Sequence, residues 1–125
     1  MVKGVGIDIV ENQRIRRAYA RFGQRFLERI FSPAELAQLG VSPPLNRLAA
    51  RFAGKEAVYK ALGPTAFGIR WQEIEILRCP AGQPEVRLSG QTEQWAQARG
   101  ITQVHLSLTH EVNYAAACAV AVGES

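Results

Sequence analysis

The sequence predicts a mixed α+β domain, because helical patterns fill most of the first half of the chain and strand patterns most of the second. The longest helical pattern runs from about Leu45 to Leu62 and is closed by Gly63-Pro64. No repeat, linker or low-complexity segment divides the 125 residues. We therefore expect a single domain over residues 1–125.

The first half begins with a β-rich run from Val2 to Val10, which we expect to be a strand buried on both faces. A helix is expected next, with a break at Gly23 and another turn or two after it. Ser32-Pro33-Ala34-Glu35 has the residues of a helix start, with Ser at the cap, Pro in the first position and Glu in the third. This third helix should end near Gly40.

The second half is expected to hold four strands and one helix, and its last two strands should form a hairpin. The strands are expected at Ile69–Leu77, Glu85–Leu88, Thr102–Thr109 and Tyr114–Val122, and the helix at Ser89–Arg99.

The composition limits the partners and the compartment. The net charge of +4 suggests an anionic partner, but nucleic acid, acidic protein and phosphorylated small molecules all fit it. Two cysteines make no disulfide framework, so we expect a cytoplasmic protein, with Cys118 buried in its apolar run. No apolar run approaches the roughly 20 residues of a membrane span, and no targeting segment is expected.

Two carboxylates stand among apolar neighbours. Asp8 lies in the first strand pattern, and Glu56 lies on the long helix, four residues before Lys60. One interpretation is that Asp8 ends a strand in solvent and that Glu56 pairs with Lys60. The other is that the two carboxylates hold a hard divalent cation, which prefers oxygen ligands. The cysteines lack neighbouring histidines, so the sequence does not indicate a zinc site.

These residues lie in two motifs, Gly6-Ile7-Asp8-Ile9-Val10-Glu11 and the segment FAGKEAVYKALG from Phe52 to Gly63. Together the motifs resemble those of the holo-acyl-carrier-protein synthases, the small single-domain class of phosphopantetheinyl transferases. The resemblance continues through the GQP at Gly82–Pro84 and the tail from His105, and so covers essentially the whole chain in the right order. It implies a 4'-phosphopantetheinyl transferase-like fold, an antiparallel sheet packed against a long helix.

The resemblance also implies an activity. The family moves 4'-phosphopantetheine from coenzyme A to a serine of apo acyl carrier protein and releases adenosine 3',5'-bisphosphate. By resemblance, Asp8 and Glu56 hold Mg²⁺ and Lys60 neutralises developing charge, so these three residues are the expected catalytic group. The base that takes the serine proton stays open between Glu56 and a metal-bound water. Lys55 is either structural or meets a phosphate from another side, and Glu11 is expected to start a helix or to support the site indirectly.

Further residues match the segments that surround coenzyme A in the family. The expected coenzyme A contacts, in addition to Lys60, are Gly63, Gly82, Pro84, Ser107, Thr109 and His110. One departure is visible after Gly63, where the family often has a Gly-Thr-Gly-like turn and this chain has Pro64-Thr65-Ala66. Because proline has no N–H, a backbone contact to phosphate at that position is lost.

A stripe of arginines on the first helical pattern indicates the partner. Arg14, Arg17, Arg21 and Arg25 recur at helical spacing. Such a run is often only a solvated face. The family, however, docks its acidic carrier protein through the first helix, so these arginines are expected to bind acyl carrier protein. The resemblance further implies a cytoplasmic homotrimer with active sites between subunits and a place in fatty acid biosynthesis or a related pathway.

Two alternatives stay open. A basic nucleic-acid-binding domain would use the arginine stripe but would give Asp8 and Glu56 no role, and no nucleic-acid-binding motif is present. An inactive homologue that only binds the carrier would explain the Pro64 departure. The sequence does not choose the carrier protein served, the preference for Mg²⁺ or Mn²⁺, or the tolerance for acyl-coenzyme A.

Overall fold

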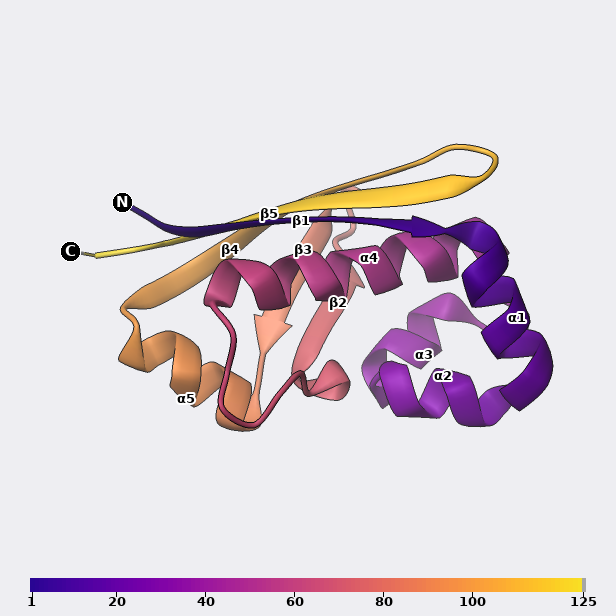
Figure 1. Ribbon diagram of the computed structural model, residues 1–125, viewed down its shortest axis with the longest axis horizontal. Helices are drawn as coiled ribbons and strands as arrows, with labels where there is room; N and C mark the ends of the chain where they lie inside the picture. Colours follow the sequence, from indigo (N-terminus) through magenta and orange to yellow (C-terminus); the bar gives the residue numbers. More distant parts are fainter. Residues whose placement is uncertain (125) are drawn as a thin grey trace.

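The computed structural model describes residues 1–124. The chain forms an α+β fold in which a long helix lies across one face of an antiparallel sheet (Figure 1). The helices are α1 (Asn12–Phe22), α2 (Gln24–Ile30), α3 (Pro33–Leu39), α4 (Leu45–Leu62) and α5 (Gly90–Ala98), with a 3-10 turn η1 (Trp71–Glu73). The strands are β1 (Val2–Glu11), β2 (Ile74–Arg78), β3 (Pro84–Leu88), β4 (Ile101–His110) and β5 (Tyr114–Gly123).

Two antiparallel sheets cover α4. The larger has the order β1-β5-β4, and the smaller is the β2-β3 hairpin. Figure 1 shows α1, α2 and α3 gathered at one end of α4 and α5 at the other end. The predicted α+β class, with an antiparallel sheet on a long helix, is confirmed.

Small residues allow α4 to lie close to the larger sheet. A Cβ atom on Gly4 or Gly6 of β1 would collide with the backbone carbonyls of Ala61 and Ala57. On the other side of the helix, Gly54 faces the side chains of Leu106 and Leu108 on β4. The helix therefore has one side against β1 and another against β4, and this arrangement positions the candidate site.

The helix starts were predictable because their signals are local. Ser32 forms the predicted capping box with Glu35, accepting the Glu35 N–H while the Glu35 carboxylate accepts the Ser32 N–H. Gly23 separates α1 from α2 with a φ of 58°, in the left-handed region that glycine adopts readily. Arg25 therefore lies on α2, so the predicted stripe of four arginines spans two helices.

The first strand is not buried on both faces, so that prediction was wrong. Its residues alternate, and Val5, Ile7 and Ile9 are exposed by 61%, 69% and 66%. Cys118, which was expected to be buried, is exposed beside Ile7 in the register of β1 and β5. The reason is geometric: α4 covers one face of the sheet, and no described residue covers the other.

The strand predicted at Ile69–Leu77 was too long. It begins only at Ile74, because residues 71–73 form the turn η1. Within residues 1–124, no helix combines the length and apolar character needed to cross a membrane.

Candidate active site

Asp8 and Lys60 meet between β1 and α4. Asp8 lies on the same face of β1 as Gly4 and Gly6, the face that contacts α4. The Lys60 ammonium donates to the Ile7 carbonyl at 3.0 Å and lies 3.3 Å from Asp8 Oδ1. The ion pair of Lys60 therefore crosses from helix to strand, and the alternative pairing with Glu56 is not observed.

Glu56 belongs to the same cluster. Its carboxylate is half-buried, and burial raises its pKa above the ordinary value. The negative charge of Asp8 raises this pKa further, while the positive charges of Lys60 and Arg14 lower it. Asp8 and Arg14, at the start of the arginine stripe, therefore both lie within electrostatic range of Glu56.

These residues fit a hydrated divalent cation. Two carboxylates that repel each other are stabilised by a cation between them, and Mg²⁺ is commonly held by one or two carboxylates while keeping several waters. Among residues 1–124 no group of three or more His, Cys, Asp or Glu side chains is placed to hold a metal ion. A cation bound by Asp8 and Glu56 would therefore take its other ligands from water or a substrate.

A second cluster lies on the β4 side of α4. Gly82, Pro84 and His110, all predicted from the sequence, line a cavity of about 520 Å³. Three arginines that the sequence analysis missed line the same cavity: Arg47, Arg51 and Arg78. Arg47 and Arg51 are four residues apart on α4, so the sequence could have predicted that they share one face of the helix. Arg78 is at the end of β2, and only the tertiary fold brings it to this cavity.

Arg51 makes this cavity suited to an anion. Its side chain is buried to 7% exposure, and its Nε has no hydrogen-bond partner among the described residues. Burial lowers the pKa of Arg51, and the charges of Arg47 and Arg78 lower it further against an opposing effect of Glu35. A buried guanidinium surrounded by like charges is stabilised by a bound anion.

The structure does not bring Ser107 and Thr109 into this cavity. Successive residues of a strand point to opposite faces, so Leu108 and His110 line the cavity while Ser107 and Thr109 lie on the exposed face of β4. In the register, Ser107 pairs with Cys118, which in turn pairs with Ile7. Ser107 and Thr109 therefore cannot contact a ligand bound in this cavity of the same chain, whereas His110 can.

The two clusters are separated within one chain. Asp8 lies on β1, and the arginine cavity lies beside β4, with β5 between the two strands. Two strand spacings correspond to about 10 Å, and α4 stands between the side chains.

The segment after α4 carries the Pro64 departure. Gly63 ends the helix with a φ of 86°. Pro64 has no N–H, and the Thr65 N–H donates to the Tyr59 hydroxyl at 3.3 Å. Neither residue therefore offers a backbone donor to a phosphate in this conformation.

An apolar pocket lies beside the arginines. Arg14, Arg17 and Arg21 on α1 and Arg25 on α2 are exposed. A pocket of about 410 Å³ lies between these helices and the wall formed by Phe52 and Trp71, whose rings stack with centroids 4.9 Å apart. Arg25 and Arg29 also line this pocket, so it combines an aromatic wall with positive charge.

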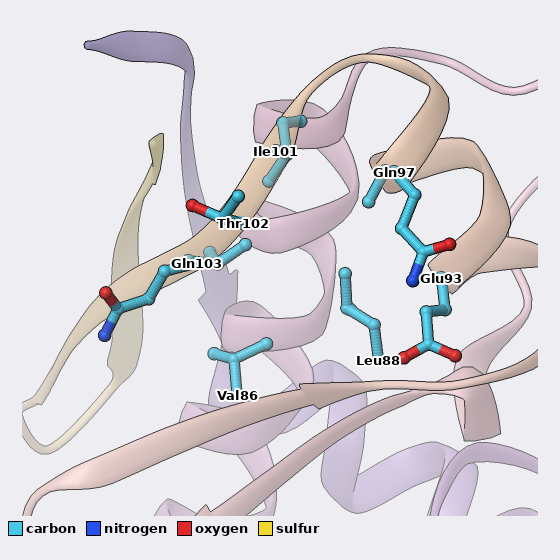
Figure 2. A pocket seen from close by; sticks show the side chains of 9 residues that line it. Val86, Leu88, Glu93, Gln97, Ile101, Thr102 and Gln103 are labelled. Atoms are coloured by element: carbon cyan, nitrogen blue, oxygen red, sulfur yellow. The ribbon is translucent and has the colours of Figure 1, made fainter. Parts of the chain in front are cut away.

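A further hollow of about 360 Å³ lies between β3, α5 and β4 and contains none of the predicted site residues. Figure 2 shows its lining side chains, which include Val86, Leu88, Glu93, Gln97 and Ile101. It is therefore distinct from the two clusters above.

The fold and the site together define a class of protein. The family model for the 4'-phosphopantetheinyl transferase superfamily matches residues 4–119. The chain therefore belongs to the 4'-phosphopantetheinyl transferase superfamily.

Within this superfamily, the chain is similar to proteins named holo-[acyl-carrier-protein] synthase. The chain is 47% identical over 126 aligned positions to the holo-[acyl-carrier-protein] synthase of Desulforudis audaxviator, covering 100% of this chain and 96% of that protein. It is 42% identical to the protein of the same name from Clavibacter michiganensis over 100% of this chain and 99% of that one. The predicted resemblance to the holo-acyl-carrier-protein synthases is confirmed.

Solved structures agree with this likeness. The holo-[acyl-carrier-protein] synthase of Neisseria meningitidis superposes with a TM-score of 0.88 at 38% identity, covering 98% of this chain and 99% of that chain. The Helicobacter pylori synthase, solved in complex with coenzyme A, gives a TM-score of 0.80 at 31% identity, covering 94% of this chain and 99% of that chain.

Proposed function

We propose that this chain transfers 4'-phosphopantetheine from coenzyme A to a serine of an apo acyl carrier protein and releases adenosine 3',5'-bisphosphate. The observation that carries the proposal is the cluster of Asp8, Glu56 and Lys60 between β1 and α4. Relatives named for this reaction, and one solved with coenzyme A, support the same conclusion.

Each residue of the cluster has a chemical role in the proposal. Mg²⁺ held by Asp8 and Glu56 would supply a Lewis acid for the pyrophosphate oxygens of coenzyme A. The Lys60 ammonium, held in place by Asp8 and the Ile7 carbonyl, neutralises charge that develops on those oxygens. The proton of the serine hydroxyl would go either to the Glu56 carboxylate or to a water on the metal.

The arginine cavity is proposed to bind the adenosine 3'-phosphate end of coenzyme A. The nearly buried Arg51, with Arg47 and Arg78 beside it, supplies the positive charge for a phosphate. Pro84 and Gly82 lie at the edge of the same cavity, where they would contact the adenine. His110 completes this set, and Gly63 remains a proposed contact at the end of α4.

The site is proposed to form between copies of the chain in a homotrimer. One chain alone presents its carboxylates and its arginine cavity on opposite sides of α4. The exposed apolar face of β1, with Val5, Ile7 and Ile9, offers a surface that a second copy would bury. Ser107 and Thr109 lie on that same outward face, so in the trimer they would meet a neighbouring copy and the coenzyme A held there.

The carrier protein is proposed to dock on α1 and α2. Arg14, Arg17, Arg21 and Arg25 supply the positive charge that an acidic carrier needs. The pocket beside Arg25, walled by Trp71, would receive an apolar side chain of the carrier. Because Arg14 acts on Glu56, a carrier bound here has its serine close to the carboxylates.

We also propose a cytoplasmic location and a role in fatty acid biosynthesis. Cys79 and Cys118 are free thiols, which suits the reducing cytoplasm. An acyl carrier protein substrate suits fatty acid biosynthesis.

The test is the reaction itself. An apo acyl carrier protein is incubated with the purified chain, coenzyme A and Mg²⁺, and its intact mass is measured. The proposal predicts the addition of one phosphopantetheine group, abolished by EDTA and in Asp8→Ala and Glu56→Ala, but retained in the exposed-surface control Glu93→Ala. Failure of the folded wild-type chain to modify any of several carriers, together with no binding of coenzyme A, would contradict it.

A further inference from the structure

Lys55 lies inside the motif on α4 but has no place in the reaction described above. Its side chain is 0% exposed, and its ammonium donates to Glu35 Oε1 at 2.6 Å and to the carbonyls of Trp71 and Ile74 at 2.7 Å each. An ammonium has three N–H donors, so all of them are used. Lys55 therefore has no donor left for a phosphate of coenzyme A.

The Glu35 carboxylate, which pairs with Lys55, is also fixed by hydrogen bonds. Glu35 on α3 is also fully buried, and it accepts from the Ser32 N–H at 3.0 Å and from the Ile76 N–H at 2.9 Å. Burial lowers the pKa of Lys55, and the adjacent Glu35 carboxylate opposes this effect. The ion pair joins α3, α4 and the start of β2 at one point.

The two carbonyls that Lys55 binds are at the two ends of the turn η1. Trp71 opens this turn and Ile74 follows it. The Trp71 ring stacks on Phe52, and together they form the aromatic wall of the pocket beside Arg25. A shift of η1 would move this wall while leaving the Asp8–Lys60 pair on the other side of α4 in place.

We propose that Lys55 is a positioning residue for recognition of the carrier protein, because it fixes the turn that carries Trp71. This inference rests on the proposed docking of the carrier at that pocket. It assigns the two lysines of the motif to different tasks. Lys60 acts on the reacting phosphates, and Lys55 shapes the surface that selects the protein substrate.

The test replaces the ion pair without leaving a buried charge alone. In Lys55→Met combined with Glu35→Gln, the glutamine retains an oxygen for the α3 cap and the methionine fills the space of the lysine stem. The KM for the carrier should rise about fivefold to tenfold, the cost of a lost interface anchor. The kcat and the KM for coenzyme A should stay within about twofold, since neither set of ligands moves.

Two comparisons separate positioning from general loss of stability. Ile76→Val is a buried substitution in β2, the strand that follows η1. It should lower the melting temperature without changing the KM for the carrier. Trp71→Leu should raise that KM as the double variant does, and the two changes combined should be far from additive. An unchanged carrier KM in the double variant, or a rise confined to coenzyme A, would overturn the proposal.

A readout without activity tests the positioning itself. In a Trp95→Phe background, Trp71 is the remaining tryptophan, and its quenching by iodide reports its exposure. Loss of the ion pair should increase this quenching, whereas Ile76→Val should not. If the wild-type chain transferred no phosphopantetheine, the proposed function and its carrier docking would be wrong. If transfer occurred but the quenching was unchanged in the double variant, Lys55 would not hold Trp71 in place.

Discussion

At the scale of single residues, the environment of Glu56 links the electrostatics to metal binding. Its charged form is disfavoured by burial and by Asp8, and a cation would remove that cost. The same two carboxylates were predicted from the sequence because each stands in an apolar pattern. Their closeness could not be predicted, because it depends on how α4 crosses β1.

The first prediction concerns Glu56→Gln. At pH 7 this variant should melt slightly above the wild-type chain without metal, because it removes a charge whose folded-state pKa is raised. Added Mg²⁺ should stabilise the wild type and not the variant, and transfer should fall at least about 100-fold. Thermal unfolding with and without Mg²⁺ measures this, with Glu93→Gln as the exposed control; equal stabilisation of both by Mg²⁺ would exclude Glu56 as a ligand.

A second prediction concerns Arg51 and uses a matched pair of substrates. Dephospho-coenzyme A lacks only the 3'-phosphate. The wild-type chain should bind coenzyme A more tightly by about 1.5–3 kcal/mol, the contribution of a hydrogen bond to a charged group. In Arg51→Met that preference should disappear, as measured by calorimetry. If Arg51→Met weakened both ligands equally, the 3'-phosphate would not lie in this cavity.

At the scale of the elements, the predictions from sequence succeeded where the signal is local. The capping box at Ser32, the glycine at the end of α4 and the final hairpin are set by neighbouring residues. Burial of the first strand was misjudged, because one uncovered face of a sheet cannot be read from an apolar run. The arginine cavity was missed because the β2-β3 hairpin carries Arg78 and Pro84 to α4 from far along the chain.

The arginine helices carry the third prediction. Reversing two charges in Arg17→Glu combined with Arg21→Glu, which leaves the charge of Arg14 near Glu56 in place, should raise the KM for an acidic carrier about tenfold or more and leave coenzyme A binding unchanged. Arg87→Glu, on the exposed surface of β3, is the control for net charge. Steady-state kinetics with carrier and coenzyme A varied separately measures both constants. An unchanged carrier KM would show that the carrier docks elsewhere.

The fourth prediction concerns the start of α5. The Glu73 carboxylate accepts from the Thr92 N–H at 2.9 Å and from its hydroxyl at 2.8 Å. Burial favours the neutral form of Glu73, but the Thr92 hydrogen bonds, the charge of Arg70 and the Gln91 N–H together lower its pKa below the ordinary value of 4.5. A lowered folded-state pKa gives stability that is present above the unfolded value and lost as the pH falls through the folded value.

Glu73→Ala should therefore melt below the wild type at pH 7, and the difference should shrink as the pH falls below about 4.5. Melting curves over this range test the assignment. Glu28→Ala, an exposed residue of α2, should show a smaller difference at pH 7. A gap for Glu73→Ala that stays constant with pH would mean that its effect is not ionic.

At the scale of the whole molecule, three features point to one arrangement. The carboxylates and the arginine cavity are on opposite sides of α4, and the outer face of β1 is apolar and exposed. Coenzyme A carries both a pyrophosphate and a 3'-phosphate, so in the proposed reaction both clusters would contact one ligand. The proposed site between copies of the chain would allow this.

The most direct test mixes two impaired variants. Asp8→Ala retains the arginine cavity, and Arg51→Met retains the carboxylate pair, so at a coenzyme A concentration well below the KM of Arg51→Met each alone should transfer little. After the two are unfolded together and refolded in equal amounts, a shared site predicts recovery of about a quarter of the wild-type rate, because one interface in four joins an intact pair to an intact cavity. Activity no higher than the mean of the two separate variants would show that one chain supplies both clusters and would contradict the account.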